Sequence, residues 1–138
     1  RVGINSRLDT LQAAILLPKL AILDAEIKAR DFLATKYSSC LSPDSRWTCP
    51  KILSENQSAW AQYTLKVSDR DEFRRKLDDA GIPTAVHYPM PLNKQPAVQD
   101  LSAVLHHGDQ MSDEVVSLPM HAYMTDATFE QIANAILD

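Results

Sequence analysis

Two short segments of this sequence carry side chains that could bind an anion or a polar ligand. In the first, residues 3–16 (GINSRLDTLQAAIL), Asn5 and Arg7 flank the polar start of an apolar run. Ser6-x-x-Asp9 has the spacing of a capping box, which predicts a helix beginning near Ser6. An amide and a guanidinium beside the positive end of a helix suit a phosphate or a carboxylate. Simpler roles stay open: Asn5 as the helix N-cap and Arg7 as half of a surface ion pair.

The second segment is His87-Tyr88, at the end of an expected strand over 84–88. It is followed by residues 89–96, where three prolines in eight residues predict a stiff, extended loop. Strand ends that lead into loops are common positions for functional side chains. The alternative is that His87 and Tyr88 are a half-buried packing pair.

The sequence gives little support for a metal site or for a glycine-rich phosphate-binding loop. His106 and His107 are adjacent, so one helix face cannot present both to a metal; we expect them in a solvated loop. With three glycines in the chain, no glycine-rich phosphate loop is present. We therefore expect no metal site and assign no catalytic residue within this chain.

Composition sets further limits. The chain has 138 residues, 45% of them apolar and 23% charged, which is ordinary for a globular domain with a core. Its net charge of −4 argues against a nucleic-acid or anionic-membrane partner. No apolar run reaches the roughly 18–20 residues that a transmembrane helix needs, and no signal-peptide pattern is present. Cys40 and Cys49, the only cysteines, match no zinc or redox spacing, and we expect them to be reduced thiols rather than a disulfide, which suits a cytoplasmic protein. The start at Arg1 fits an excised portion of a longer protein.

The elements that must position these side chains begin with a long helix over about 6–37. Its apolar residues recur at three- and four-residue steps, and between Leu11 and Leu23 they spread over more than one face. A helix of this kind is covered on more than one side. Pro18 removes a backbone donor, so we expect a kink there or a break into two helices.

The remainder, 38–138, reads as a small separate domain. The segment 42–58 is expected to be an irregular connection, with Trp47 packed over another part of the protein. Besides the strand over 84–88, the pattern predicts strands over 61–67 and 115–119 and a helix over 70–80 between a Ser68-Asp69 cap and a Gly81 stop. It also predicts a helical turn over 110–114 and a final helix capped by Thr125 or Asp126. This order predicts an α+β fold: a long helix, then two layers containing a short, mainly antiparallel sheet.

Three blocks of the sequence resemble motifs of one enzyme family in its order and at about its spacing. Residues 3–14 are similar to GxNxRLDxLQAA, residues 81–92 (GIPTAVHYPMPL) to GIxTxVHYPxPLH, and residues 117–121 (SLPMH) to the start of SLPMHPxLT. These are motifs of the DegT/StrS family of pyridoxal-phosphate (PLP)-dependent sugar aminotransferases, which are fold type I enzymes. Asn93 stands where the family usually has His, and Ala122 where it has Pro.

The resemblance implies roles that composition and spacing do not. The protein would be a homodimer that transfers an amino group, from glutamate, to a keto sugar carried on a nucleotide. Asn5 would contact the cofactor phosphate of the neighbouring subunit. Arg7, His87 and Tyr88 would contact the sugar-nucleotide substrate. The chain itself would be the C-terminal portion of the enzyme, with the large PLP-binding domain missing.

The resemblance also implies what this portion cannot do alone. The family's Schiff-base lysine lies upstream of the first block, and the seven lysines here stand in none of its motif context. We therefore expect the isolated chain to be inactive and to hold no PLP. Two other hypotheses remain: a free-standing α+β module that binds a ligand or oligomerises, and a lysine-less dehydratase or regulator.

Overall fold

A three-stranded antiparallel sheet forms the centre of the protein. The computed structural model describes residues 3, 6–100 and 102–138. The strands β1 (Trp47–Thr48), β2 (Tyr63–Val67) and β3 (Val115–Leu118) lie in this order in the sheet, with Trp47 opposite Val67 and Tyr63 opposite Leu118. The elements in chain order are α1 (Thr10–Leu41), β1 (Trp47–Thr48), β2 (Tyr63–Val67), α2 (Arg70–Asp79), the 3-10 turn η1 (Leu92–Lys94), α3 (His106–Glu114), β3 (Val115–Leu118) and α4 (Asp126–Leu137). The α+β fold expected from the sequence is confirmed.

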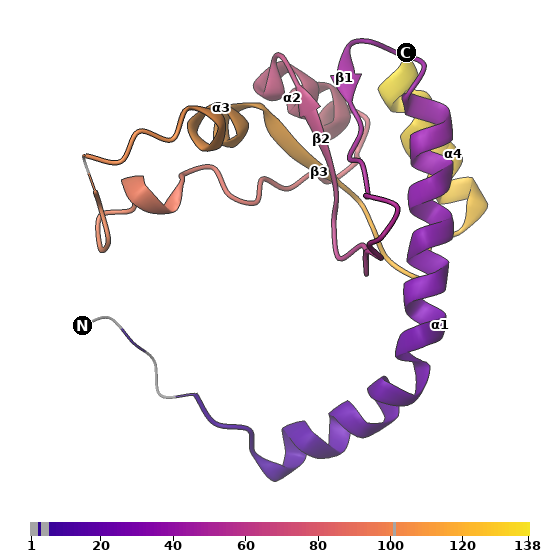
Figure 1. The fold of residues 1–138 in the computed structure, drawn as a ribbon. Helices are drawn as coiled ribbons and strands as arrows, with labels where there is room; N and C mark the ends of the chain where they lie inside the picture. The colour runs from indigo at the N-terminus through magenta and orange to yellow at the C-terminus, as the bar shows by residue number, and fades with distance from the viewer. Residues whose placement is uncertain (1–2, 4–5, 101) are drawn as a thin grey trace.

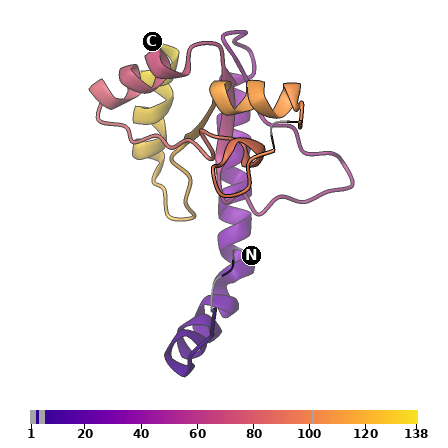
Figure 2. The same cartoon turned by 90° about the vertical axis from the view of Figure 1, so that its left-hand side faces the viewer.

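One hydrophobic core joins the sheet to the helices. In β2 the residues Tyr63, Leu65 and Val67 are buried while those between them are half-buried, the alternation of a strand with one face on a core. Helix α1 lies beside α4, and the segment 88–114 projects on the opposite side of the sheet (Figures 1 and 2). None of the helices in the described ranges combines the length and apolarity that a bilayer crossing requires.

Tyr37, near the C-terminal end of α1, lies at the centre of this core. Its ring centroid is 5.0 Å from that of Tyr63 and 5.0 Å from that of Phe129. Its hydroxyl donates to the carbonyl of Pro119 at 3.0 Å, so burial leaves no unpaired donor. A single residue thereby ties α1 to β2, to α4 and to the segment after β3.

The long helix starts later and ends later than the sequence predicts. Asp9 is the N-cap: its carboxylate accepts from the N–H of Gln12 at 2.9 Å, and the Gln12 side chain accepts from the N–H of Asp9 at 3.1 Å. The capping box is therefore Asp9-x-x-Gln12, and Ser6 lies before it, exposed. At the other end the helix continues to Leu41 because its buried stripe continues past Tyr37.

Pro18 does not divide the helix in two. It lies inside a continuous α1, whose N-terminal half runs in a different direction from the rest (Figure 1). A bend rather than a break fits a proline whose missing donor removes one hydrogen bond of the helix.

The second helix follows the sequence signals closely. The side chain of Asp69 accepts from the N–H of Glu72 at 2.9 Å and caps α2. Gly81 has φ +72°, the left-handed conformation that ends many helices. The final helix likewise begins at Asp126 with Thr125 as its cap.

Three expectations are wrong. Residues 84–88 form no strand: only Ala85 pairs, with Ser117 of β3, and the flanking Pro83 and Pro89 have no N–H to extend a ladder. His106 and His107 lie in the first turn of α3 rather than in a loop. The segment 42–58 contains the short strand β1, whose Trp47 is buried as expected.

Candidate functional site

His87 and Tyr88 are held at the edge of the sheet by one backbone bridge. The N–H of Ala85 donates to the carbonyl of Ser117 at 3.1 Å, and the N–H of Ser117 donates back at 2.7 Å. Beyond this bridge the chain turns away, and the peptide bond between His87 and Tyr88 is cis. The two rings meet edge to face with centroids 5.8 Å apart, and both residues are exposed.

Both side chains line a pocket of about 610 Å³. It lies between the proline-rich segment, α3 and the edge of the sheet. Most of its wall is apolar, as in many small-molecule sites. The other lining residues are Thr64, Met90, Pro91, Leu92, Gln95, Gly108, Met111, Ser112 and Val115.

The polar groups of this wall are mostly occupied by the fold. The Gln95 amide donates to the carbonyl of Met90 at 3.2 Å, the Ser112 hydroxyl donates to that of Asp109 at 2.7 Å, and Thr64 shares a hydrogen bond of 2.9 Å with Ser117. Within the described ranges, the side chains of His87 and Tyr88 form no hydrogen bond. They are therefore the groups in this wall that are available to a ligand.

The pocket contains little charge. Among the described residues that line it there is no lysine or arginine, and His87 is its one ionisable base. A strongly anionic ligand group would need cations from outside this pocket.

Arg7 lies elsewhere on the molecule. It is exposed, two residues before the N-cap of α1, and it is not among the residues that line the pocket. The structure therefore brings His87 and Tyr88 together but does not join them to Arg7. Asn5, the remaining site residue predicted from the sequence, lies outside the described residues.

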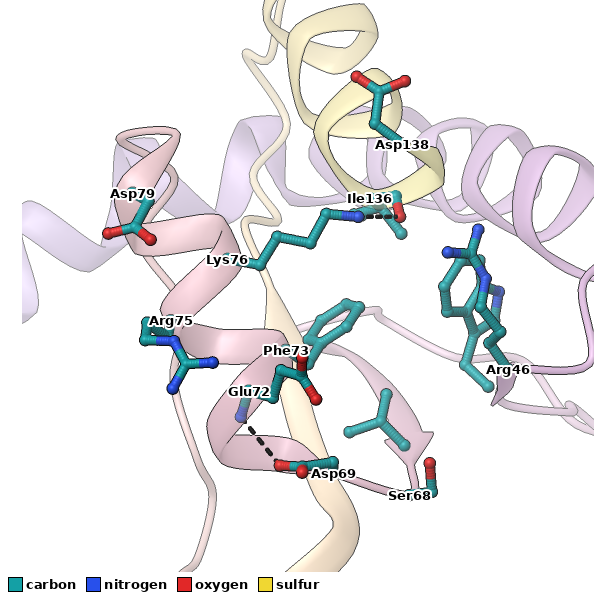
Figure 3. A pocket seen from close by; sticks show the side chains of 12 residues that line it. Arg46, Ser68, Asp69, Glu72, Phe73, Arg75, Lys76, Asp79, Ile136 and Asp138 are labelled. Atoms are coloured by element: carbon teal, nitrogen blue, oxygen red, sulfur yellow. Dashed lines mark hydrogen bonds between the residues drawn. The ribbon is translucent and has the colours of Figure 1, made fainter.

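A second cavity, of about 650 Å³, lies where β1, the end of β2, one face of α2 and the end of α4 meet (Figure 3). Lys76 reaches across it to donate to the carbonyl of Ile136 at 3.1 Å, and Arg46 donates to that of Leu137 at 2.8 Å. These cations satisfy carbonyls at the C-terminal end of α4, where no intrahelical donor is available. Of the predicted site residues that the structure describes, Arg7, His87 and Tyr88, none lines this cavity.

No set of three or more His, Cys, Asp or Glu side chains in the described ranges could hold a metal ion.

Comparison with known proteins decides the family. Residues 1–137 match the sequence profile of the DegT/DnrJ/EryC1/StrS aminotransferase family. The chain belongs to this family. The resemblance of its three motif blocks is thereby confirmed. His87 and Tyr88, which line the pocket described above (the His87 pocket), belong to the second block.

Individual members of the DegT/DnrJ/EryC1/StrS family are similar over almost the whole chain. The UDP-2-acetamido-2-deoxy-3-oxo-D-glucuronate aminotransferase of Pseudomonas aeruginosa is 51% identical over 136 residues, which are 99% of this chain and 38% of that protein. The crystal structure of DesV from S. venezuelae is 32% identical and superposes with a TM-score of 0.90, over 97% of this chain and 37% of DesV. The structure of ntda from Bacillus subtilis with bound cofactor PMP is 31% identical, with a TM-score of 0.84 over 98% of this chain and 33% of that one.

The chain thus spans little more than a third of the length of these family members. Its described residues do not fit PLP on their own. In the part of the chain that the structure describes, no lysine lines the His87 pocket, and the ammonium group of Lys76, in the second cavity, donates a hydrogen bond to the carbonyl of Ile136. A PLP site of this family would need residues that the described part of the chain does not contain.

Proposed function

We propose that the protein to which this chain belongs is a PLP-dependent aminotransferase that moves an amino group from glutamate to a nucleotide-linked keto sugar. The observation that carries the proposal is the 51% identity, over 99% of the chain, to an aminotransferase acting on a UDP-linked 3-oxo sugar acid. A UDP-linked 3-keto sugar is accordingly the substrate class we propose first.

In this reading the chain supplies one wall of the substrate site. Sugar and nucleoside groups are rich in hydroxyls, and the imidazole of His87 and the phenol of Tyr88 can each donate to and accept from them. The apolar surface around them, including Met90 and Met111, suits the uncharged faces of a base or a sugar ring. This wall orients the substrate and excludes water from it.

The charged parts of the substrate would be bound by other residues. Because no described lysine or arginine lines the His87 pocket, we propose that a diphosphate or a sugar carboxylate is bound by a cation from outside it. Arg7 is our candidate, since a guanidinium can bind either anion in a bidentate manner. It would approach the substrate once the rest of the protein, or a partner subunit, is in place.

Asn5 is proposed to contact the phosphate of PLP in the neighbouring subunit of a homodimer. When bound, PLP supplies the electron sink for amino-group transfer, a chemistry that no side chain provides. The donor to that phosphate would be the neutral amide of Asn5, with added attraction from the start of α1.

The proposal also gives each part of the chain a place in the domain organisation of the whole enzyme. Residues 1–37 would form the helix at the boundary with the large domain, and residues 38–138 the small domain. The exposed leucines of α1, among them Leu17 and Leu20, are consistent with a surface that another part of the protein covers. Alone, the chain would be inactive and would hold no PLP, and the whole enzyme would be cytoplasmic.

Amino-group transfer can be tested directly on the full-length protein. We would incubate it with PLP, glutamate labelled with ¹⁵N, and a UDP-linked 3-keto sugar, and follow the nucleotide sugar by mass spectrometry. The expected product is an amino sugar nucleotide that carries the label. Failure with every UDP- and dTDP-linked keto sugar tried, by a folded protein that holds PLP, would favour a dehydratase or regulator. Ligand binding without PLP would favour a free-standing module.

A further inference from the structure

Within the described ranges, helix α1 packs on the rest of the chain only through its C-terminal part. The buried residues of α1 are Leu33, Ala34, Tyr37 and Leu41. From Asp9 to Ala25, by contrast, every residue is exposed except the half-buried Ala13. The helix therefore stops packing on the small domain near Glu26, and apolar contacts with other described segments do not set its direction before that point. Figure 1 shows the N-terminal part of α1 projecting away from the sheet.

Polar contacts surround the helix at this exit. The hydroxyl of Tyr123, in the segment between β3 and α4, donates to Glu26 Oε1 at 2.6 Å. Lys19 Nζ lies 3.5 Å from the same oxygen, and Arg30 Nη1 lies 3.8 Å from Glu26 Oε2. The Glu26 side chain is only 14% exposed. The hydrogen bond from Tyr123 is the main cause that lowers the pKa of the Glu26 carboxyl, so this carboxylate stays ionised at neutral pH.

A second set of contacts holds the same turns of the helix from another loop. Arg30 Nε donates to the carbonyl of Ala59 at 2.8 Å, and Trp60 Nε1 donates to Asp31 Oδ1 at 2.8 Å. Trp60 is buried and stacks on Tyr63, the first residue of β2, with ring centroids 5.6 Å apart. The helix is thus tied both to the segment before β2 and to the segment after β3.

We propose that the helix-exit clamp, formed by Glu26, Arg30, Asp31, Trp60 and Tyr123, positions the N-terminal half of α1 relative to the His87 pocket. Its members are positioning residues: none of them lines that pocket. The bond between Glu26 and Tyr123 joins residues 97 positions apart and, within the described ranges, is the most N-terminal hydrogen bond of α1 to another element.

The clamp matters because it lies between the two halves of the proposed substrate site. Arg7 lies before the free half of α1, whereas His87 and Tyr88 belong to the body of the small domain. A small rotation at Glu26 would move Arg7 by a larger distance, because about 25 Å of helix at 1.5 Å per residue separates them. The clamp would thereby set how well one substrate molecule can contact Arg7 and the His87 pocket at the same time. This step rests on the function proposed above.

The test uses the full-length protein and four variants. Tyr123→Phe and Glu26→Ala remove the contact. Glu26→Gln keeps an acceptor for the Tyr123 hydroxyl. Tyr37→Phe, the matched control, removes another tyrosine hydroxyl that bonds α1 to the segment after β3, but from the packed end of the helix. Every native cysteine, the free Cys40 and Cys49 among them, is first replaced by alanine. Spin labels at Thr10→Cys and Gln131→Cys, in subunits diluted with unlabelled protein, then report the distance between the start of α1 and α4.

Tyr123→Phe and Glu26→Ala should broaden or shift this distance distribution, Glu26→Gln should largely preserve it, and Tyr37→Phe should lower stability without changing it. In the first two variants KM for the nucleotide sugar should rise about fivefold, while kcat changes less than about twofold. A spin-label distance distribution that is unchanged in both Tyr123→Phe and Glu26→Ala would overturn the proposal. A changed distribution with an unchanged KM would overturn it as well. If the wild-type protein transfers no amino group, the proposed function fails, and the distances alone still decide whether the clamp positions α1.

Discussion

Ala85 and Ser117 exchange both of their backbone hydrogen bonds, at 3.1 Å and 2.7 Å. This bridge fixes the segment before His87 against β3, whose Val116 and Leu118 are buried. His87 follows two residues later, at the mouth of the pocket. The exposed side chain of His87, which has no hydrogen-bond partner among the described residues, thus follows a segment that is bonded to the buried strand β3. This bridge keeps the position of His87 defined.

His87→Ala should impair substrate binding without unfolding the protein, because the side chain is exposed and bonds no described residue. In the full-length enzyme we expect kcat/KM for the nucleotide sugar to fall about tenfold, the size of one lost hydrogen bond to a polar ligand. His107→Ala is the matched control, since His107 is also exposed but does not line the pocket. Equal effects of the two substitutions would argue against a role for the pocket.

The stability of the 138-residue chain should fall at alkaline pH. Burial raises the pKa of both Tyr37 and Tyr63 above the ordinary value of about 10. The unfolded state therefore loses these protons first, so the stability is fully present below pH about 10 and declines as the pH rises above it.

Denaturant titrations between neutral and alkaline pH measure this decline. Tyr37→Phe removes one of the two groups, so the decline should become shallower. At neutral pH the same variant should lose about 1 kcal/mol, because its hydrogen bond to Pro119 is gone. A pH dependence equal to that of the wild type would show that Tyr37 ionises as readily in the folded state as in the unfolded one.

The isolated chain should self-associate through α1. Its exposed groove contains Leu16, Leu17, Leu20 and Leu23, and burial of such a surface contributes roughly 25 cal/mol per Å². Sedimentation over a concentration series should show association that Leu16→Glu and Leu20→Glu reduce. Gln131→Glu adds the same charge on α4 and should have no effect. A compact monomer at every concentration would contradict the prediction.

Asn5 should act across a subunit boundary in the full-length enzyme. Asn5→Ala is mixed with a variant that lacks the Schiff-base lysine, each inactive alone. In a hybrid dimer one site would combine an intact lysine with the partner's intact asparagine, so activity should recover to about half of the wild type per hybrid dimer. Absence of recovery despite proven subunit exchange would mean that Asn5 serves its own subunit.

Local signals in the sequence were sufficient for α2, for β2 and for the start of α4. A cap such as Asp69, a stop such as Gly81 and the alternation in β2 each act within a few residues, so tertiary packing did not override them. The predicted start of α1 was wrong because two possible capping boxes, Ser6-x-x-Asp9 and Asp9-x-x-Gln12, overlap in the sequence. Only the structure selects Asp9 over Ser6.

Non-local features could not be read from the sequence in this way. The strand expected over 84–88 reduces to one bridge, because its pairing depends on what β3 and the flanking prolines leave available. The position of His87 and Tyr88 at a loop entrance was predictable. That Met111 and Ser112 of α3 face them was not, since no spacing rule connects these segments. The contact of Tyr123 with Glu26 likewise has no local signature.

The central claim is that the pocket of His87 and Tyr88 forms part of the substrate site of a sugar aminotransferase. The most direct measurement is a crystal structure of the full-length protein with a UDP-linked 3-amino sugar, the expected product. We predict that His87 or Tyr88 lies within about 3.2 Å of a polar atom of this ligand, a normal hydrogen-bond distance. A well-ordered ligand that leaves the pocket empty and contacts neither residue would contradict the account.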